Sequence, residues 1–269
     1  MRLKRSKSNH NKSNTFGNQY LMLLMHYREN FGEASILDFL IKIDNLFSVL
    51  WLLDSRIMQI QTRSFIIMRK MDEISKRVLD KEKGAVDFLQ DKVLTYGYED
   101  EKASTAVDIE KFYSLIDNED WGGYSGTRVN KTRYLLLKLD LLTGSDKMKL
   151  DFNKSVASIE HLMPQKLEPK NWHMNQAFHK QWLHKLGNIV LIDKRKNSAF
   201  SNSSYEAKKA KFKAQYIETR PNTTYIFDKH SQWDEGAIGE NHHRVLSLLK
   251  SYYEGNSLKT FKEVNKKVF

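Results

Sequence analysis

The chain has 269 residues, a formal net charge of +11 and no cysteine. The lack of cysteine excludes disulfide bonds and thiolate metal sites, and the hydrophobic share of 40% argues against global disorder. The positive charge favours a polyanionic partner, although charge bears on partners and solubility and not on the fold.

The N-terminal part predicts a short tail followed by helices. Residues 1–15 are basic and polar, so we expect a disordered tail, and no apolar segment follows them directly as a secretory signal would require. Residues 16–120 form the expected helical N-terminal region, because apolar residues recur there at spacings of three and four. The longest apolar stretch, 36–53, carries two aspartates, a lysine and an asparagine, so it predicts a buried helix and no membrane span. We therefore expect a cytoplasmic protein without membrane contact.

Residues 121–255 form the second expected domain, and residues 256–269 a C-terminal tail. The fold class that the pattern predicts is mainly α, with one embedded hairpin and helix, and therefore α+β overall. In chain order we expect a buried helix at 134–142, a strand at 155–162, a helix at 175–185, a strand at 189–192, a helix capped by Ser203 or Ser204 and running to 216, a loop after Pro221, and a helix at 237–253.

A carboxylate and a histidine lie side by side at the end of the first expected strand, as Glu160 and His161. Imidazole can accept a proton near neutral pH, and Glu160 and Asn197 offer hard oxygen ligands that suit Mg²⁺ or Mn²⁺. Hydrolysis of a phosphodiester needs such a base and such a cation. Adjacent side chains on a strand point to opposite faces, so this interpretation requires the strand to end or twist at the pair.

The excess positive charge follows the Glu-His pair. Residues 166–213 contain eleven Lys and Arg against three Asp and Glu. A phosphate backbone would be attracted to this segment, where we expect Lys194 and Arg195 to contact nucleic acid. His173, His179 and His184 fit no zinc spacing, so we interpret them as structural or as weak phosphate contacts.

The ordered motifs resemble the HNH, or ββα-metal, nuclease domain of the GmrSD-type modification-dependent restriction proteins. The residues that carry the resemblance are Ile159–Gln165 (IEHLMPQ), Leu186–Leu191 (LGNIVL), Asn197, Tyr205 with Lys208 and Lys209, and Trp233 with Ile238 and Arg244. The similarity spans roughly residues 120–250. It implies an embedded ββα-metal module and a metal-dependent DNA endonuclease of restriction or phage defence.

The resemblance also implies roles for single residues. His161 would be the general base, and Glu160 a metal ligand where the wider group more often has aspartate. Asn188 would hold the histidine-bearing loop by hydrogen bonds. Asn197 would be the second metal ligand, with Asn202 as the fallback.

The resemblance further implies that Lys208 and Lys209 contact phosphate, and that the cofactor is Mg²⁺ or Mn²⁺. Proteins of this type carry, or pair with, a ParB-like nucleotide-hydrolysing domain, and no glycine loop of the Walker type occurs in this sequence. A partner subunit would then supply any nucleotide dependence, and the chain would be a separate nuclease subunit or the C-terminal piece of a split protein.

Other interpretations of the same residues stay open. Gly187-Asn188 alone would suit an ordinary turn, Asn197 a solvated loop, and the lysines at 208–213 a solvated helix face. Two other functions compete with the nuclease: a catalytically silent nucleic-acid-binding relative, and a helical interaction subunit that uses residues 16–120.

Overall fold

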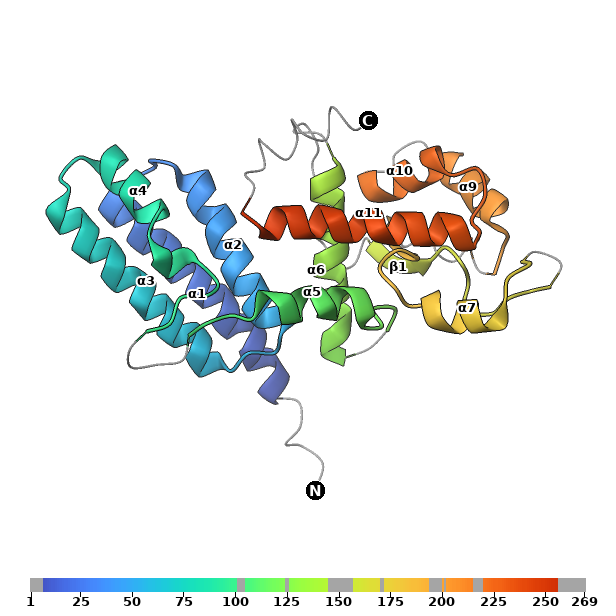
Figure 1. The fold of residues 1–269 in the computed structure, drawn as a ribbon, viewed down its shortest axis with the longest axis horizontal. Coiled ribbons are helices and arrows are strands. Elements are labelled where there is room, and N and C mark those ends of the chain that lie inside the picture. Colours follow the sequence, from blue (N-terminus) through green and yellow to red (C-terminus); the bar gives the residue numbers. More distant parts are fainter. Residues whose placement is uncertain are drawn as a thin grey trace, which may run out of the picture. The chain divides into compact units, whose positions relative to one another are not determined.

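The structure is a computed structural model that describes residues 7–100, 105–123, 126–144, 157–169, 172–193, 200, 202–214 and 220–255. Helices dominate, and the described strands form one two-stranded sheet, so the expected mainly helical α+β class is confirmed (Figure 1). The chain divides into two compact units, Met1–Phe112 and Tyr113–Phe269. Residues 113–120, expected in the N-terminal helical region, lie in the second unit. Among the described residues, no helix has both the length and the apolar character needed to cross a membrane.

The first unit is a helical bundle. Its elements are α1 (Lys7–Phe31), α2 (Ile36–Leu52), α3 (Ile57–Arg77), α4 (Lys81–Leu89) and the short 3₁₀ helix η1 (Lys92–Leu94). Helix α1 begins at Lys7, inside the segment expected to be a disordered tail. An aromatic cluster fills the core: Tyr27 stacks on Phe39 with ring centroids 4.0 Å apart, and Phe31 stacks on Phe88 at 5.5 Å. Such rings bury large apolar areas and hold the helices together.

The second unit places a β-hairpin among helices. After α5 (Ile109–Asn118) and α6 (Gly126–Thr143) come β1 (Ala157–His161), α7 (Gln176–Trp182), β2 (Ile189–Asp193), α9 (Tyr205–Lys213), α10 (Pro221–Lys229) and α11 (Glu235–Tyr253). Helix α6 packs on α10, α11 and β2 (Figure 1). The core includes Leu162, Val190 and Ile192 from the hairpin and Phe200, Phe227 and Trp233 from the surrounding segments.

The two strands pair antiparallel, and the register fixes the site. Ala157 pairs with Asp193 and His161 with Ile189, so His161 closes one end of the ladder. The strand ends at His161, as the interpretation of the Glu-His pair required. Leu162 N then donates to Asn188 O at 2.9 Å, which holds the chain against the second strand just beyond the ladder.

The expected helix boundaries hold in part. Ser204 caps α9 by accepting from Ala207 N at 3.3 Å, as one of the two expected caps. Helix α7 ends at Trp182, earlier than the expected 185. The prediction of a loop directly after Pro221 is wrong, because helix α10 begins at this proline. Proline suits the first turn of a helix, where its missing N–H is not needed.

Candidate active site

His161 lies at the end of β1 with its ring almost fully enclosed, since only 2% of the residue is exposed. Its Nε2 lies 3.0 Å from Nδ1 of His184, a residue between α7 and β2. Burial, followed by the nearby His184, lowers the pKa of His161 from 6.5 to about 3. The imidazole is therefore neutral near neutral pH and keeps a lone pair that can accept a proton.

Glu160 and its neighbour His161 contact different partners, because adjacent side chains on a strand point to opposite faces. Its Oε1 accepts from Nζ of Lys208 at 2.8 Å, and both residues are buried. Burial raises the pKa of Glu160 and lowers that of Lys208, while their mutual attraction opposes both shifts. The pair lies beneath the end of β1 and joins that strand to α9.

Lys208 makes two further bonds to the strand that carries the site. Its Nζ donates to His161 O at 2.6 Å and to Leu162 O at 3.2 Å. The expected phosphate contact places this ammonium at the surface, whereas the structure encloses it completely, with 0% of the residue exposed. The reason is its helical phase, because Tyr205, Lys208 and Phe212 share the buried face of α9.

Asn188 lies in the turn before β2 and is completely buried. Its Oδ1 accepts from Met163 N at 2.8 Å and from Trp233 Nε1 at 3.0 Å. Its Nδ2 donates to Met163 O at 3.1 Å and to Leu183 O at 2.8 Å. One side chain thus fixes the backbone two residues beyond His161, which is the kind of contact that the resemblance implies for it.

The other expected residues are not brought to this centre by the described contacts. Lys209 Nζ donates to His230 O at 2.8 Å, in the segment after α10. Asn202 lies in the turn that precedes α9. Asn197, Lys194 and Arg195 lie outside the described residues.

Two further residues, His184 and Gly122, lie at this centre although the sequence pattern does not indicate this role for either. His184 was interpreted as structural or as a weak phosphate contact, yet its ring meets that of His161. Gly122 lies so close to both rings that a Cβ there would overlap His184 Nδ1 and His161 Nε2. A sequence signal existed for each: the histidine precedes the Leu-Gly-Asn motif by two residues, and Gly122 belongs to a Trp-Gly-Gly run.

A metal site can be tested against these side chains. Among the described residues, no three His, Asp or Glu side chains form a group that could hold a metal ion. Mg²⁺ keeps several waters and commonly binds to one or two carboxylates together with substrate phosphates, so it does not require such a group. Glu160 is a hard oxygen donor and accepts the Lys208 bond through Oε1 alone. The donor set is therefore compatible with Mg²⁺ held by Glu160 and the substrate.

The second unit matches a known protein family. The family model described as GmrSD restriction endonucleases, C-terminal domain, matches residues 110–247, slightly more than half of the chain and including every described residue of the centre. No curated protein gives a significant match to the chain.

Proposed function

Because the chain belongs to the GmrSD restriction endonuclease family, through the C-terminal domain of those proteins, we propose that it is an HNH-type, metal-dependent DNA endonuclease that hydrolyses phosphodiester bonds. Its biological role would be restriction or phage defence. The observation that carries the proposal is the convergence of β1, the turn before β2, and α9 on one point. Glu160 and His161 end the strand, Asn188 fixes the backbone beyond them, and Lys208 reaches the same backbone from the helix.

His161 supplies the base in this proposal. Its neutral imidazole takes a proton from water as the water attacks phosphorus. A pKa of about 3 makes the ring a weak base in the free protein. A phosphodiester anion beside the ring favours the charged imidazolium and so raises that pKa when the substrate binds.

Glu160 would hold the Mg²⁺ or Mn²⁺ ion, and Asn197, or Asn202 in its place, would be the second protein ligand. The bound ion would stabilise charge on the phosphate and on the departing 3′ oxygen. Lys208 keeps the Glu160 carboxylate in one place through its bond to Oε1. Lys194, Arg195 and Lys209 would contribute phosphate contacts, which provide affinity but no sequence information.

Any dependence on nucleotide hydrolysis would come from a ParB-like partner subunit, as the resemblance implies. The base identity or modification of the target would then be recognised outside the centre described above. We accordingly propose that the chain acts on DNA as the cleaving component of a larger restriction system.

A catalytically silent relative that binds nucleic acid is the second candidate. The observation that favours it is the enclosure of His161, which is only 2% exposed and has its Nε2 close against Gly122. A phosphodiester would therefore need neighbouring groups to move before it could contact the ring.

Cleavage of supercoiled plasmid distinguishes the two candidates. The full chain is incubated with Mg²⁺ or Mn²⁺ beside a His161→Ala variant and an EDTA control. Nicking by wild type alone, abolished by EDTA, is the result that the endonuclease proposal expects. Equal nicking by wild type and His161→Ala would show that His161 is not the base. Plasmid binding without nicking, with unmodified and modified DNA, would support the silent relative.

A further inference from the structure

The ring of His184 contacts the ring of His161 edge to face. The ring centroids are 5.1 Å apart with an interplanar angle of 75°, and the nearest ring nitrogens, His184 Nδ1 and His161 Nε2, are 3.0 Å apart. This is hydrogen-bond distance, so one of the two nitrogens donates a proton that the other accepts. The tautomer of either ring therefore fixes the tautomer of the other.

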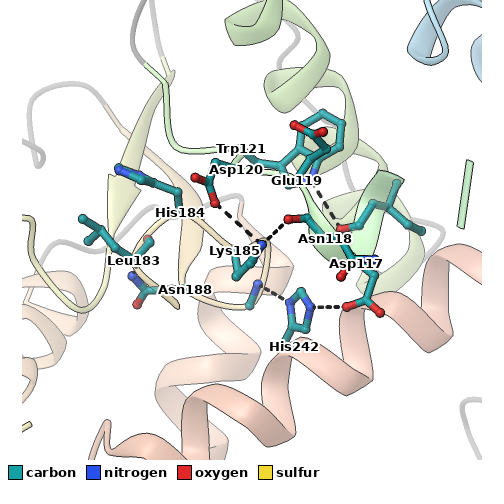
Figure 2. A network of polar contacts seen from close by, with 12 residues as sticks. Asp117, Asn118, Glu119, Asp120, Trp121, Leu183, His184, Lys185, Asn188 and His242 are labelled. Carbon is teal, nitrogen blue, oxygen red and sulfur yellow. Dashed lines mark hydrogen bonds and ion pairs between the residues drawn. The ribbon is translucent and has the colours of Figure 1, made fainter. Parts of the chain in front are cut away.

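The backbone of His184 is held independently of its ring. Trp121 N donates to His184 O at 2.8 Å, and Thr132 Oγ1 in α6 donates to Trp121 O at 2.7 Å. Lys185 Nζ donates to Asn118 O. The segment from Asn118 to Trp121 is thereby tied to the turn that carries His184 (Figure 2).

A second set of contacts ties the same two segments to α11. His242 Nε2 lies 3.1 Å from Asp117 Oδ1, and Gly187 N donates to His242 Nδ1 at 3.2 Å (Figure 2). His242 thus bridges the end of α5 and the Leu-Gly-Asn turn. With both its flanking segments bonded, His184 has a defined place relative to the end of β1.

Gly122 completes the enclosure of the two rings. Any side chain there would overlap both bonded nitrogens, whereas a Cβ at the neighbouring Gly123 would meet nothing within 4 Å. The absence of a side chain at position 122 is therefore a condition for the His161–His184 contact, and position 123 offers a matched control.

We propose that His184 is a positioning residue for the general base: it accepts the Nε2–H of His161 and so directs the basic lone pair of that ring to Nδ1. The inference rests on the proposed function, since it assigns His184 a part in the same reaction. A ring nitrogen's protonation is set by the hydrogen bond that the other nitrogen makes, so His184 selects one tautomer of His161. Gly122 permits this contact, and the bonds of Trp121 and Lys185 keep His184 in place.

The first test observes the tautomer and does not depend on cleavage. Histidine ¹⁵N shifts of the full chain distinguish the two neutral tautomers, and His161→Asn assigns the His161 signals. The wild type is expected to show His161 as the Nε2–H tautomer at pH 7. His184→Phe is expected to give a mixture, and so is Gly122→Ala. An unchanged His161 tautomer in His184→Phe, or a wild type with the proton on Nδ1, would overturn the inference.

The second test uses cleavage kinetics. His184→Phe is expected to lower kcat by about 100-fold with little change in KM, because a misplaced catalytic group costs rate more than binding. His184→Asn places Oδ1 where Nδ1 was, so it is expected to recover most of the rate. Exposed His243, changed to Phe, serves as the matched control. Equal losses in His184→Asn and His184→Phe would contradict the positioning role.

The two tests separate failure of the inference from failure of the proposed function. If the wild type does not cleave under any metal or DNA condition, the endonuclease proposal fails, and the ¹⁵N shifts alone decide whether His184 sets the His161 tautomer. If the wild type cleaves and His184→Phe cleaves equally well, the endonuclease proposal stands and the inference fails.

Discussion

Nζ of Lys208 lies 2.8 Å from Oε1 of Glu160, and the helix lysine and the strand carboxylate are both buried. A buried ion pair gains its attraction only by giving up the hydration of both charges. The Lys208 ammonium recovers part of that loss through the carbonyl oxygens of His161 and Leu162. The pair therefore fixes where the Glu-His end of β1 lies on α9.

Lys208→Met is accordingly expected to destabilise the protein by about 3 kcal/mol, because it leaves a buried carboxylate without its partner. Burial already raises the pKa of Glu160, so protonation of that carboxyl limits the loss. Urea unfolding at pH 7.5 measures the difference. The double variant with Glu160→Gln is expected to be more stable than Lys208→Met alone, since no unpaired buried charge remains.

Lys213 on the same helix is the matched control for Lys208. Its Nζ lies 2.7 Å from Asp228, but the two side chains are 52% and 59% exposed. Exposed pairs contribute about 0–1 kcal/mol, so Lys213→Met is expected to change the free energy of unfolding little. If the two lysine variants unfolded at the same urea concentration, the buried pair would not have the role assigned to it.

The sequence predicted the local elements of the second unit well and the contacts of single polar residues less well. The strands and the Ser204 cap follow from short apolar runs and a side-chain oxygen before a helix, both of which are local properties. The burial of Lys208 had a local signal too, since it shares a helical face with Tyr205 and Phe212. The family resemblance, however, implied a phosphate contact for Lys208.

The part played by His184 and Gly122 could not be predicted from local pattern. The two residues are far apart in the sequence and meet only because the turn before β2 bonds to the segment after α5. Helix α10 was missed for a different reason, because the pattern treated Pro221 as a break and not as a first helical residue. Long-range contacts and the position of a proline within a turn both depend on the folded chain.

Acid is expected to destabilise the second unit from about pH 6.5 downward. Burial lowers the pKa of His161 to about 3 and also lowers those of His230 and His242. Below pH 6.5 the unfolded chain binds protons that the folded chain does not. The contribution of these histidines to the free energy of unfolding is therefore fully present above pH 6.5 and is lost as the pH falls below it.

Urea unfolding between pH 7.5 and 5, with EDTA present, measures this dependence before most carboxylates titrate. His242→Asn is expected to reduce the slope, because one buried histidine no longer differs between the two states. His243 is exposed, so His243→Asn is expected to leave the slope unchanged. A free energy of unfolding that stayed constant or increased from pH 7 to 5 would contradict the assignment of these histidines as neutral in the fold.

Substitution of Asn188 is expected to abolish cleavage as substitution of Glu160 or His161 would, although Asn188 need not touch the substrate. Asn188→Ala removes bonds to Met163 N, Met163 O, Leu183 O and Trp233 Nε1, and water has no access to this buried position. Leaving buried donors and acceptors without partners costs about 1–3 kcal/mol for each group, with incomplete additivity. We expect a loss of at least about 3 kcal/mol in urea unfolding, together with loss of cleavage.

Asn188→Asp separates the donor role of this side chain from its acceptor role. Aspartate keeps an oxygen for Met163 N and Trp233 Nε1, but its second oxygen would face the carbonyl oxygens of Met163 and Leu183, to which Nδ2 now donates. We therefore expect Asn188→Asp to be no more stable than Asn188→Ala at pH 7.5. The exposed Asn118, changed to Ala, should stay near wild type. A stable and active Asn188→Asp protein would show that the two donated bonds do not hold the loop beyond His161, and that the acceptor contacts alone suffice.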